Sequence, residues 1–322
     1  MSRNNGESDI PASELAMDCE SASTIIVEFI KKKVQGGRKQ GVLLGLSGGV
    51  DSALVATLAV KAIGPDKVHA LYIFDRDNQR RSLLHAQQVA GKLGIDLKTI
   101  DMSRLSQEGA AFTRPPRVSP LPSFGNRIVF AMLGPASRIA FGQNPYLVAL
   151  RRQPPEKGWF RKGLYRLIVE RVNTGFDRKH RLRRAILEDN AQKNNLLLVG
   201  CANKSEAMVG WFVKDGVDDL PLEPILGLYK TQVRQLARCL DVPQEIVEQA
   251  PIPDMLKGLT DEMGIGHRYE RLDIVLYVIE KGLAPEVAYR KGIKSGEFED
   301  IKAINRLSAW KRESPHEYPN IS

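Results

Sequence analysis

The chain has 322 residues, 43% of them hydrophobic, which suits one large α/β domain or two small ones and excludes a disordered polypeptide. No stretch approaches about 18 consecutive apolar residues, so the sequence predicts no transmembrane helix. The N-terminal residues lack the apolar core of a secretory signal, and the cysteines are three in number with no metal-like spacing. We therefore expect a cytoplasmic protein in a reducing compartment, without a disulfide framework.

The net charge of +9 is concentrated in one segment of the chain. Between Thr113 and Gly175 there are eleven Lys or Arg residues and two Asp or Glu residues, so the remainder of the chain is neutral. The same segment contains eight prolines. Because a structureless loop of this length is uncommon inside a compact domain, we expect a basic insertion with short helices of its own at about residues 113–175, within a single domain spanning residues 1–322.

Before this segment, strands and helices alternate along the chain. A helix is predicted over Glu14–Val34, where apolar residues recur at helical spacing and lysines and glycines mark the end. The elements that follow are strand Val42–Leu46, helix Ala53–Ile63, strand Val68–Phe74, helix Ser82–Leu93 and strand Leu97–Ile100. This alternation predicts an α/β fold, a doubly wound parallel sheet with flanking helices.

After the basic segment, the regular pattern returns. The predicted elements are helix His180–Lys193, strand Leu196–Gly200, and helices Lys230–Leu240, Gln244–Glu248 and Tyr269–Lys281. There is no internal repeat and no sustained heptad pattern, so the sequence does not predict a solenoid or a coiled coil.

The stretch GLSGGVDS, residues 45–52, lies between a predicted strand and a predicted helix. A glycine-rich turn that leads into a helix N-terminus directs several backbone N–H groups at one point, which favours an anion. Ser47 and Ser52 add hydroxyl donors, whereas Asp51 suits a Mg²⁺ ion between its carboxylate and phosphates. A plain N-cap is the alternative. Two glycines followed by both Asp and Ser exceed what a cap needs, so we favour a nucleotide site.

Residues 47–52 resemble the SGGxDS loop of the ATP-pyrophosphatase (N-type) superfamily, whose fold is adenine nucleotide alpha hydrolase-like. Its members bind the pyrophosphate of ATP and transfer AMP to an acceptor oxygen. The superfamily includes ammonia- and glutamine-dependent amide ligases and several tRNA-modifying enzymes, so the loop alone leaves the acceptor open.

Later stretches resemble the ammonia-dependent NAD synthetases. GCANKSE (200–206) is similar to that family's GTxNKSE turn, and GLYKTQVRQLARCLDVPQEI (227–246) to its DLYKTQVRELARYLGVPEEI. Counterparts also exist for WFVKDGVDDLP (211–221), LTDEMGIGHRYERLD (259–273), the helix RLRRAILEDNAQKNN (181–195) and AWKRESP (309–315). The resemblance covers about residues 20–105 and 175–315, in the family's order.

The resemblance implies a role for individual residues. Asp51 and Glu206 would hold Mg²⁺, and Asp51 and Lys230 would be catalytic, with Lys230 as a point charge on the phosphates. The ATP site would comprise Gly45, Leu46, Ser47, Gly48, Gly49, Val50, Asp51, Ser52, Cys201 and Lys230, and the deamido-NAD site Arg181, Lys214, Asp218 and Lys311. Asp219 competes with Asp218 for this role, because the segment that contains them is shorter than its counterpart in the family. Each of the four deamido-NAD residues, taken alone, is more readily a surface charge.

The implied reaction has two steps, adenylation of the deamido-NAD carboxylate by ATP and displacement of AMP by ammonia. No glutaminase domain is visible in the sequence, so we expect free ammonia or a separate amidotransferase partner to supply the nitrogen. The resemblance also implies a homodimer. The basic insertion, with its interspersed aromatic residues, could bind RNA or an anionic surface.

Four positions depart from the family's pattern at the implied site: Cys201, Ile252, Gly264 and Trp310. They leave open a divergent enzyme that adenylates another small acid, or a tRNA-modifying or sulfur-transfer relative in which Cys201 takes part. A small buried cysteine is the simpler interpretation of Cys201.

Overall fold

The computed structural model describes residues 15–75, 78, 80–105, 144–154, 158–252 and 260–321, and within them a parallel β-sheet forms the centre of the fold. The strands are β1 (Val42–Gly45), β2 (Val68–Phe74), β3 (Asp96–Asp101) and β4 (Leu197–Val199), in the order β3-β2-β1-β4. All three pairings are parallel. The central strands β1 and β2 are mostly buried because helices cover both faces of the sheet, whereas the edge strands β3 and β4 are more exposed.

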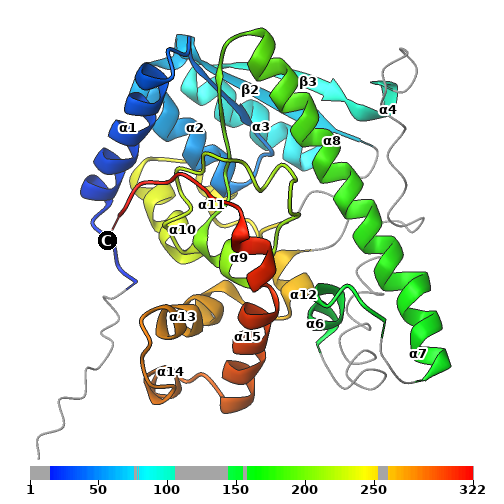
Figure 1. Ribbon diagram of the computed structural model, residues 1–322. Helices are drawn as coiled ribbons and strands as arrows, with labels where there is room; N and C mark the ends of the chain where they lie inside the picture. The colour runs from blue at the N-terminus through cyan, green and yellow to red at the C-terminus, as the bar shows by residue number, and fades with distance from the viewer. Residues whose placement is uncertain are drawn as a thin grey trace, which may run out of the picture.

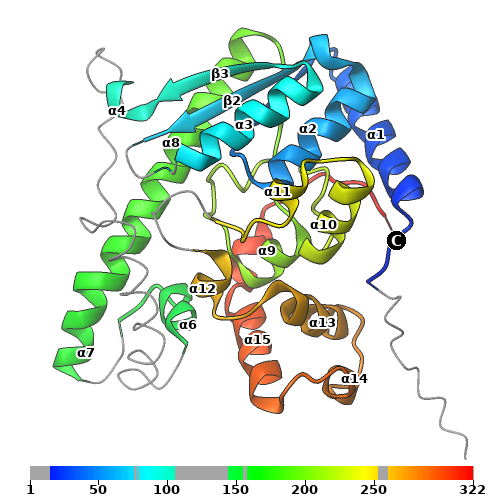
Figure 2. The ribbon, with the colours of Figure 1, turned by 180° about the vertical axis from the view of Figure 1, so that it is seen from behind.

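One face is covered by α1 (Cys19–Gly36), α2 (Val50–Ile63), α3 (Arg80–Leu93) and α10 (Lys230–Cys239), whose apolar residues form one core with the sheet. The long helix α8 (Arg171–Lys193) packs against β1 and β4 on the other face, and Ile186 and Leu187 join a second core there. Figures 1 and 2 show the sheet between these two layers. The predicted doubly wound α/β fold is therefore confirmed.

A smaller helical layer lies below the carboxyl ends of the strands in Figure 1. Its own core includes Tyr146, Val209, Tyr269 and Ile304. The helices that contribute to it are α6 (Pro145–Leu150), α9 (Lys204–Val209), α12 (Asp261–Ile265), α13 (Tyr269–Glu280), α14 (Glu286–Arg290) and α15 (Ser295–Leu307). The remaining elements are η1 (Pro65–Lys67), α4 (Met102–Leu105), α7 (Trp159–Leu164), the π-helical segment η2 (Tyr165–Glu170), α11 (Gln244–Val247) and η3 (Ala309–Glu313).

The predicted boundaries are close to the observed ones for the first three strands and for α2, α3, α10 and α13. Helix α8 is the main exception, because it begins at Arg171 rather than at His180. The basic segment contains the short helices α6 and α7, as the sequence predicts, while its residues 113–143 lie outside the described part of the chain. The assignment of 113–175 as an insertion in a single domain stays a prediction.

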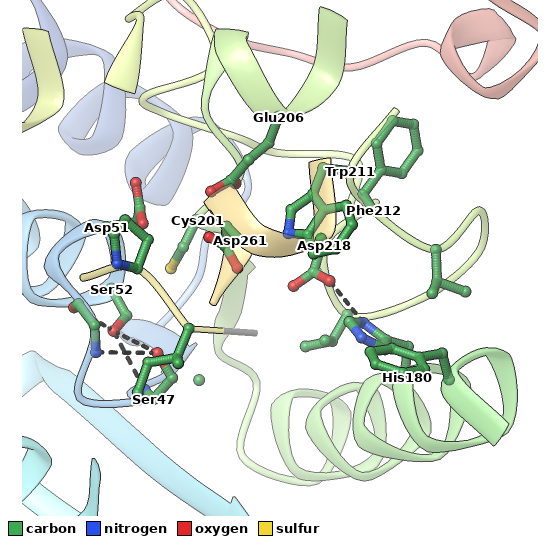
Figure 3. A pocket seen from close by; sticks show the side chains of 18 of the residues that line it. Ser47, Asp51, Ser52, His180, Cys201, Glu206, Trp211, Phe212, Asp218 and Asp261 are labelled. Carbon is green, nitrogen blue, oxygen red and sulfur yellow. Dashed lines mark hydrogen bonds and ion pairs between the residues drawn. The ribbon is translucent and has the colours of Figure 1, made fainter. Parts of the chain in front are cut away.

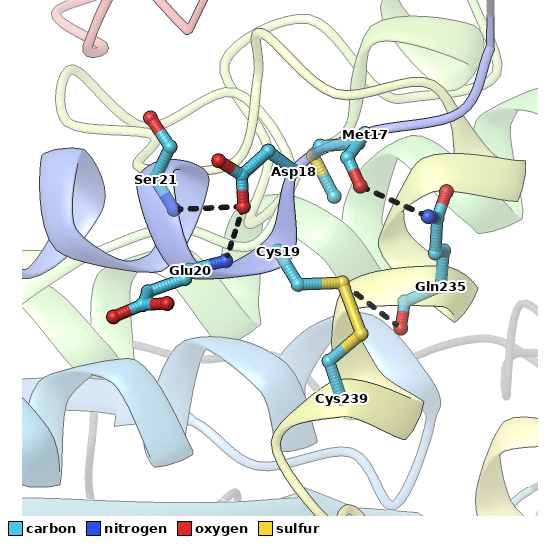
Figure 4. The surroundings of a disulfide bond; sticks show 7 residues. All are labelled: Met17, Asp18, Cys19, Glu20, Ser21, Gln235 and Cys239. Carbon is cyan, nitrogen blue, oxygen red and sulfur yellow. Dashed lines mark hydrogen bonds between the residues drawn. A yellow bond between two sulfur atoms is a disulfide. The ribbon is translucent and has the colours of Figure 1, made fainter. Parts of the chain in front are cut away.

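The expectation of no disulfide is wrong. Cys19, at the start of α1, is bonded to Cys239, at the end of α10, across a separation of 220 residues (Figure 4). This pairing could not be predicted from the sequence, because the two helices come together only when both pack on α2. Cys201 is the remaining cysteine and is free.

Among the described residues, no helix is both long and apolar enough to cross a membrane.

Candidate active site

The glycine-rich stretch forms the turn between β1 and α2, at the carboxyl edge of the sheet. Gly48 has a φ of 84°, and a Cβ there would lie 2.2 Å from the carbonyl oxygen of Ser82. Only glycine therefore fits this turn without displacing α3. The Ser52 hydroxyl lies 3.1 Å from that of Ser47 and accepts from the Ser47 backbone N–H at 3.2 Å. These hydrogen bonds hold the turn in place, and the N-terminus of α2 faces the cavity at the carboxyl edge of the sheet (Figure 3).

Lys230 places a buried cation beside this turn. It is the first residue of α10 and is 1% exposed, and its Nζ lies 2.5 Å from Asp51 Oδ2 and 2.9 Å from Glu206 Oε1. Asn203, the N-cap of α9, donates to Asp51 Oδ1 at 3.0 Å. Residues from α2, α9 and α10, far apart in the sequence, therefore meet at one point.

A second hydrogen-bond network fixes Lys230 from behind. The backbone N–H of Lys230 donates to Ser205 Oγ at 2.8 Å, and that hydroxyl donates to Asp273 Oδ1 at 2.5 Å. Asp273 also accepts from the Thr231 backbone N–H at 2.8 Å. Burial raises the pKa of Asp273 to about 6, against the opposing effect of these donors. The start of α10 is consequently held to α9 and α13.

The carboxylates around Lys230 outnumber the cation. Burial would lower the pKa of Lys230, but the charges of Asp51, Glu206 and Asp261 raise it above its ordinary value, so the amine stays charged. Burial, and to a smaller extent the charge of Asp51, raises the pKa of Glu206 to about 8 despite Lys230. The pKa of Asp261 rises to about 6 for the same reasons. The site therefore carries an excess of acidic groups that a further cation would stabilise.

These residues line one large cavity of about 710 Å³. One end contains the Gly45–Ser52 turn, Lys230, Glu206 and Asp261. The other end is aromatic and charged, and is lined by Tyr146, Arg152, Phe176, Asp177, His180, Arg183, Trp211, Phe212, Asp218 and Lys311. Figure 3 shows the two ends side by side, with Cys201, Glu206 and Asp261 between the serine-rich turn and the His180–Asp218 pair.

The structure brings two of the four predicted acceptor residues into the cavity. Asp218 Oδ2 lies 2.6 Å from His180 Nδ1, and the charges of His180 and Arg183 lower the pKa of Asp218 although burial opposes them. Lys311 is buried and also lines the cavity. Arg181 is exposed on α8, and Lys214 contacts the Trp310 carbonyl oxygen and Glu313, so neither lines the cavity described here.

Three positions that depart from the family's pattern have a local explanation. Cys201 lines the cavity, but burial raises the pKa of its thiol well above the usual range, so the thiolate that sulfur transfer requires is disfavoured. A Cβ at Gly264 would lie 2.1 Å from the ring of Trp211, which occupies that space. The Trp310 ring faces Arg152, whose Cζ lies 5.7 Å from its centroid. Nothing in the structure explains Ile252.

Several cavity residues were not predicted from the sequence. Asp261 belongs to the quoted stretch 259–273, but only its burial beside Lys230 distinguishes it from other helix-start acids. His180 and Arg183 flank Arg181 on α8, and the phase of that helix decides which of them faces the cavity. Arg152 lies in the basic segment, where the sequence offers no pattern to single it out.

Asp51 and Glu206 fit a Mg²⁺ ion by their chemistry. Both present carboxylate oxygens to the same Lys230 nitrogen, and both belong to the cluster with excess negative charge. Within the described residues, no three His, Cys, Asp or Glu side chains are arranged to hold a metal by themselves. Mg²⁺ usually takes one or two protein carboxylates and completes its shell with phosphate oxygens and water.

The architecture defines the class as an α/β protein of the adenine nucleotide alpha hydrolase fold. The structure of an NMN synthetase from Francisella tularensis matches with a TM-score of 0.62 at 23% identity, covering 94% of this chain and 98% of that one. An NH3-dependent NAD synthetase from Campylobacter jejuni matches with a TM-score of 0.60 at 22% identity, covering 94% and 99%. These similarities support the fold.

Sequence comparison identifies the family. The NAD synthase model matches residues 23–114 and 169–315. The NH(3)-dependent NAD(+) synthetase of Thermotoga maritima is 36% identical over 259 residues, which is 80% of this chain and 86% of that protein. The protein of the same description from Methanosarcina mazei is 30% identical over 301 residues, 93% of this chain and 98% of that one. The chain belongs to the NAD synthase family.

Proposed function

We propose that this protein is an ammonia-dependent NAD synthetase, a carbon–nitrogen ligase that converts deamido-NAD, ATP and ammonia into NAD, AMP and pyrophosphate. Family membership supports the reaction. The structural observation that carries it is the single cavity that joins the glycine-rich turn and Lys230 to a second, aromatic and charged end. Such a cavity can hold ATP and an acceptor acid together, so that the reacting atoms meet without water between them.

In the first step, an oxygen of the acceptor carboxylate attacks the α-phosphorus of ATP, and the bond to the bridging oxygen of pyrophosphate breaks. The N–H groups at the start of α2 and the Ser47 and Ser52 hydroxyls bind the phosphates. Lys230 neutralises the charge that develops on the departing pyrophosphate, because its amine is buried and held charged. A Mg²⁺ ion held by Asp51 and Glu206 would add Lewis-acid stabilisation of the same phosphates.

In the second step, ammonia attacks the carbonyl carbon of the acyl-adenylate, the carbon–oxygen bond to AMP breaks, and the amide forms. The attacking nitrogen must lose a proton. We assign its acceptance to Asp261, whose carboxyl lines the cavity near Lys230 and has a pKa of about 6, so that it is ionised at neutral pH yet basic enough to take the proton.

The test uses purified protein with ATP, Mg²⁺, ammonium and deamido-NAD, with AMP, pyrophosphate and NAD measured together. Equal amounts of the three products are expected. Pyrophosphate release without NAD would instead indicate another acceptor. Omitting Mg²⁺ by chelation should abolish all three products if the ion is needed.

Other features of the assignment stay predictions. They are the cytoplasmic location, the homodimer, a separate amidotransferase that supplies nitrogen, and binding of RNA or an anionic surface by the basic segment. The raised pKa of the Cys201 thiol argues against the sulfur-transfer alternative, and no contact in the described residues favours a different reaction over amidation.

A further inference from the structure

Helix α6 forms a wall of the cavity although it belongs to a span that the family model does not match. The two matched segments leave residues 115–168 between them. The Tyr146 hydroxyl donates to the Val209 carbonyl oxygen at 3.0 Å, and its ring meets Trp211 edge-to-face at 5.1 Å between centroids. The helix is therefore anchored on the loop that follows α9. Arg152, two residues after its end, reaches the cavity.

Arg152 is held in one position, and its backbone conformation is unfavourable for a non-glycine residue. Its backbone has a φ of 49°, a left-handed conformation that non-glycine residues adopt rarely and mainly where the surroundings fix them. Its Nη1 and Nη2 atoms donate to the two carboxylate oxygens of Asp177 at 2.7 and 2.8 Å. Trp310 covers the guanidinium at 5.7 Å. The side chain is 39% exposed, so its remaining N–H donors are accessible to a ligand.

Lys311 presents a second cation to the same end of the cavity. Its Nζ donates to the carbonyl oxygens of Gly210, at 2.6 Å, and of Phe212. Burial and then the charge of Arg152 lower the pKa of Lys311 to about 8, against the opposing effect of Asp177, Asp218 and Asp219. Both cations lie beside the Trp310 ring, with Arg152 Cζ 5.7 Å and Lys311 Nζ 6.0 Å from its centroid, and an anion between them would relieve their mutual repulsion.

Deamido-NAD, the proposed acceptor, carries two kinds of anionic group, a carboxylate and phosphates, and both must fit in this cavity. Its carboxylate must lie at the Lys230 end, where ATP is cleaved, so a group at the opposite end is a different one. An arginine fork fixed by a bidentate carboxylate, beside a lysine, suits the several oxygens of a phosphate.

We propose that Arg152, together with Lys311, binds a phosphate group of the acceptor, so that the α6 segment selects acceptors by their phosphate. This inference rests on the proposed function, because the acceptor is the acid to be amidated. Asp177 and Trp310 position the guanidinium and do not themselves bind the ligand.

The experiment compares Arg152→Met with Arg151→Met as a matched control. Arg151 is the exposed neighbour at the end of the same helix and does not line the cavity. Three acceptors are used: deamido-NAD, nicotinate mononucleotide and nicotinate riboside, which lacks phosphate. Loss of a charge-assisted hydrogen bond predicts a rise of about tenfold or more in KM for the two phosphorylated acceptors with Arg152→Met. The KM for ATP, the kinetics of the riboside and the Arg151→Met variant should remain unchanged, and Arg152→Lys should restore part of the loss.

Two results would overturn the inference. One is an unchanged KM for the phosphorylated acceptors, and the other is an equal loss with the riboside, which would show a purely structural role. Turnover of deamido-NAD by the unaltered protein decides the proposed function separately. If that turnover is absent, calorimetric titration of deamido-NAD still compares the two variants, and equal affinities, or no binding by the unaltered protein, count against the inference.

Discussion

Replacing Lys230 by methionine removes the cation from the cluster of Asp51, Glu206 and Asp261 while preserving most of the side-chain volume. Asp51, Glu206 and Asp261 then face one another without a compensating charge. Because Lys230 lowers the pKa of both Glu206 and Asp261, these carboxyls should take up protons more readily in the variant. The variant therefore loses both the charge that we propose faces pyrophosphate and the ionised form of the neighbouring carboxyls.

Two magnitudes follow from this geometry. Breaking a buried ion pair by removing one partner costs about 3 to 5 kcal/mol of folding free energy, reduced here by protonation of the carboxyls. Loss of one preorganised charge at the site of developing charge lowers kcat by about a hundredfold to a thousandfold. Pyrophosphate release measures the catalytic effect, and thermal unfolding with saturating ATP and without it measures the stability effect.

The matched control is Lys204→Met, because Lys204 also pairs with a carboxylate, Glu280 at 2.9 Å, but does not line the cavity. It should lose little activity. If Lys230→Met retained more than about a tenth of the pyrophosphate release of the unaltered protein while remaining folded, the role assigned to its charge would be wrong.

Four further results are expected. Gly48→Ala should abolish ATP binding, because the new Cβ would lie 2.2 Å from the Ser82 carbonyl oxygen and the backbone has a φ of 84°. Gly91→Ala, whose Cβ would have no atom within 4 Å, should bind ATP normally. Nucleotide binding retained by Gly48→Ala in a titration would contradict this. Asp261→Asn should slow NAD formation more than pyrophosphate release, and an equal effect on both would remove its role in the second step. The pKa of Asp273 is about 6 in the folded state against an ordinary value of 3.8, so between about pH 4 and pH 6 the folded state keeps a proton that the unfolded state loses. The unfolding free energy of the unaltered protein, relative to that of Asp273→Asn, should therefore fall by up to about 3 kcal/mol as the pH rises through this range. A difference that does not change with pH in urea titrations would refute this. Cys19→Ser should lower the melting temperature, as reduction of the unaltered protein does, because it removes a cross-link across 220 residues that stabilises the fold by up to about 5 kcal/mol. The melting temperature of the variant itself should not change when a reductant is added.

The sheet and the glycine-rich end of the site could be predicted from the sequence. Apolar runs and glycine stops locate β1, β2 and α2, and the glycine-rich turn between β1 and α2 has a chemistry that can be read locally. The meeting of Asp51, Glu206 and Lys230 was predictable only by resemblance, because they are brought together by the packing of three helices.

The aromatic and charged end of the site depends on the phase of a helix and on a backbone conformation, neither of which could be predicted from a single sequence. Arg181 was expected in the cavity, yet the phase of α8, set by Ile186 and Leu187 packing on the sheet, directs His180 and Arg183 there. Arg152 depends on a left-handed residue at the end of a short helix, a conformation for which its local sequence has no marker.

The Cys19–Cys239 bond closes a covalent ring that contains Asp51, Glu206, Lys230 and the whole basic segment. A single peptide-bond cleavage anywhere between the two cysteines would leave the fragments joined, and their separation would require a reductant. The oxidised protein is therefore expected to run on a denaturing gel as one species after such a cut and as two after reduction. The N-terminal helix and the helix that begins at Lys230 thus remain members of one molecule even when the chain between them is no longer continuous.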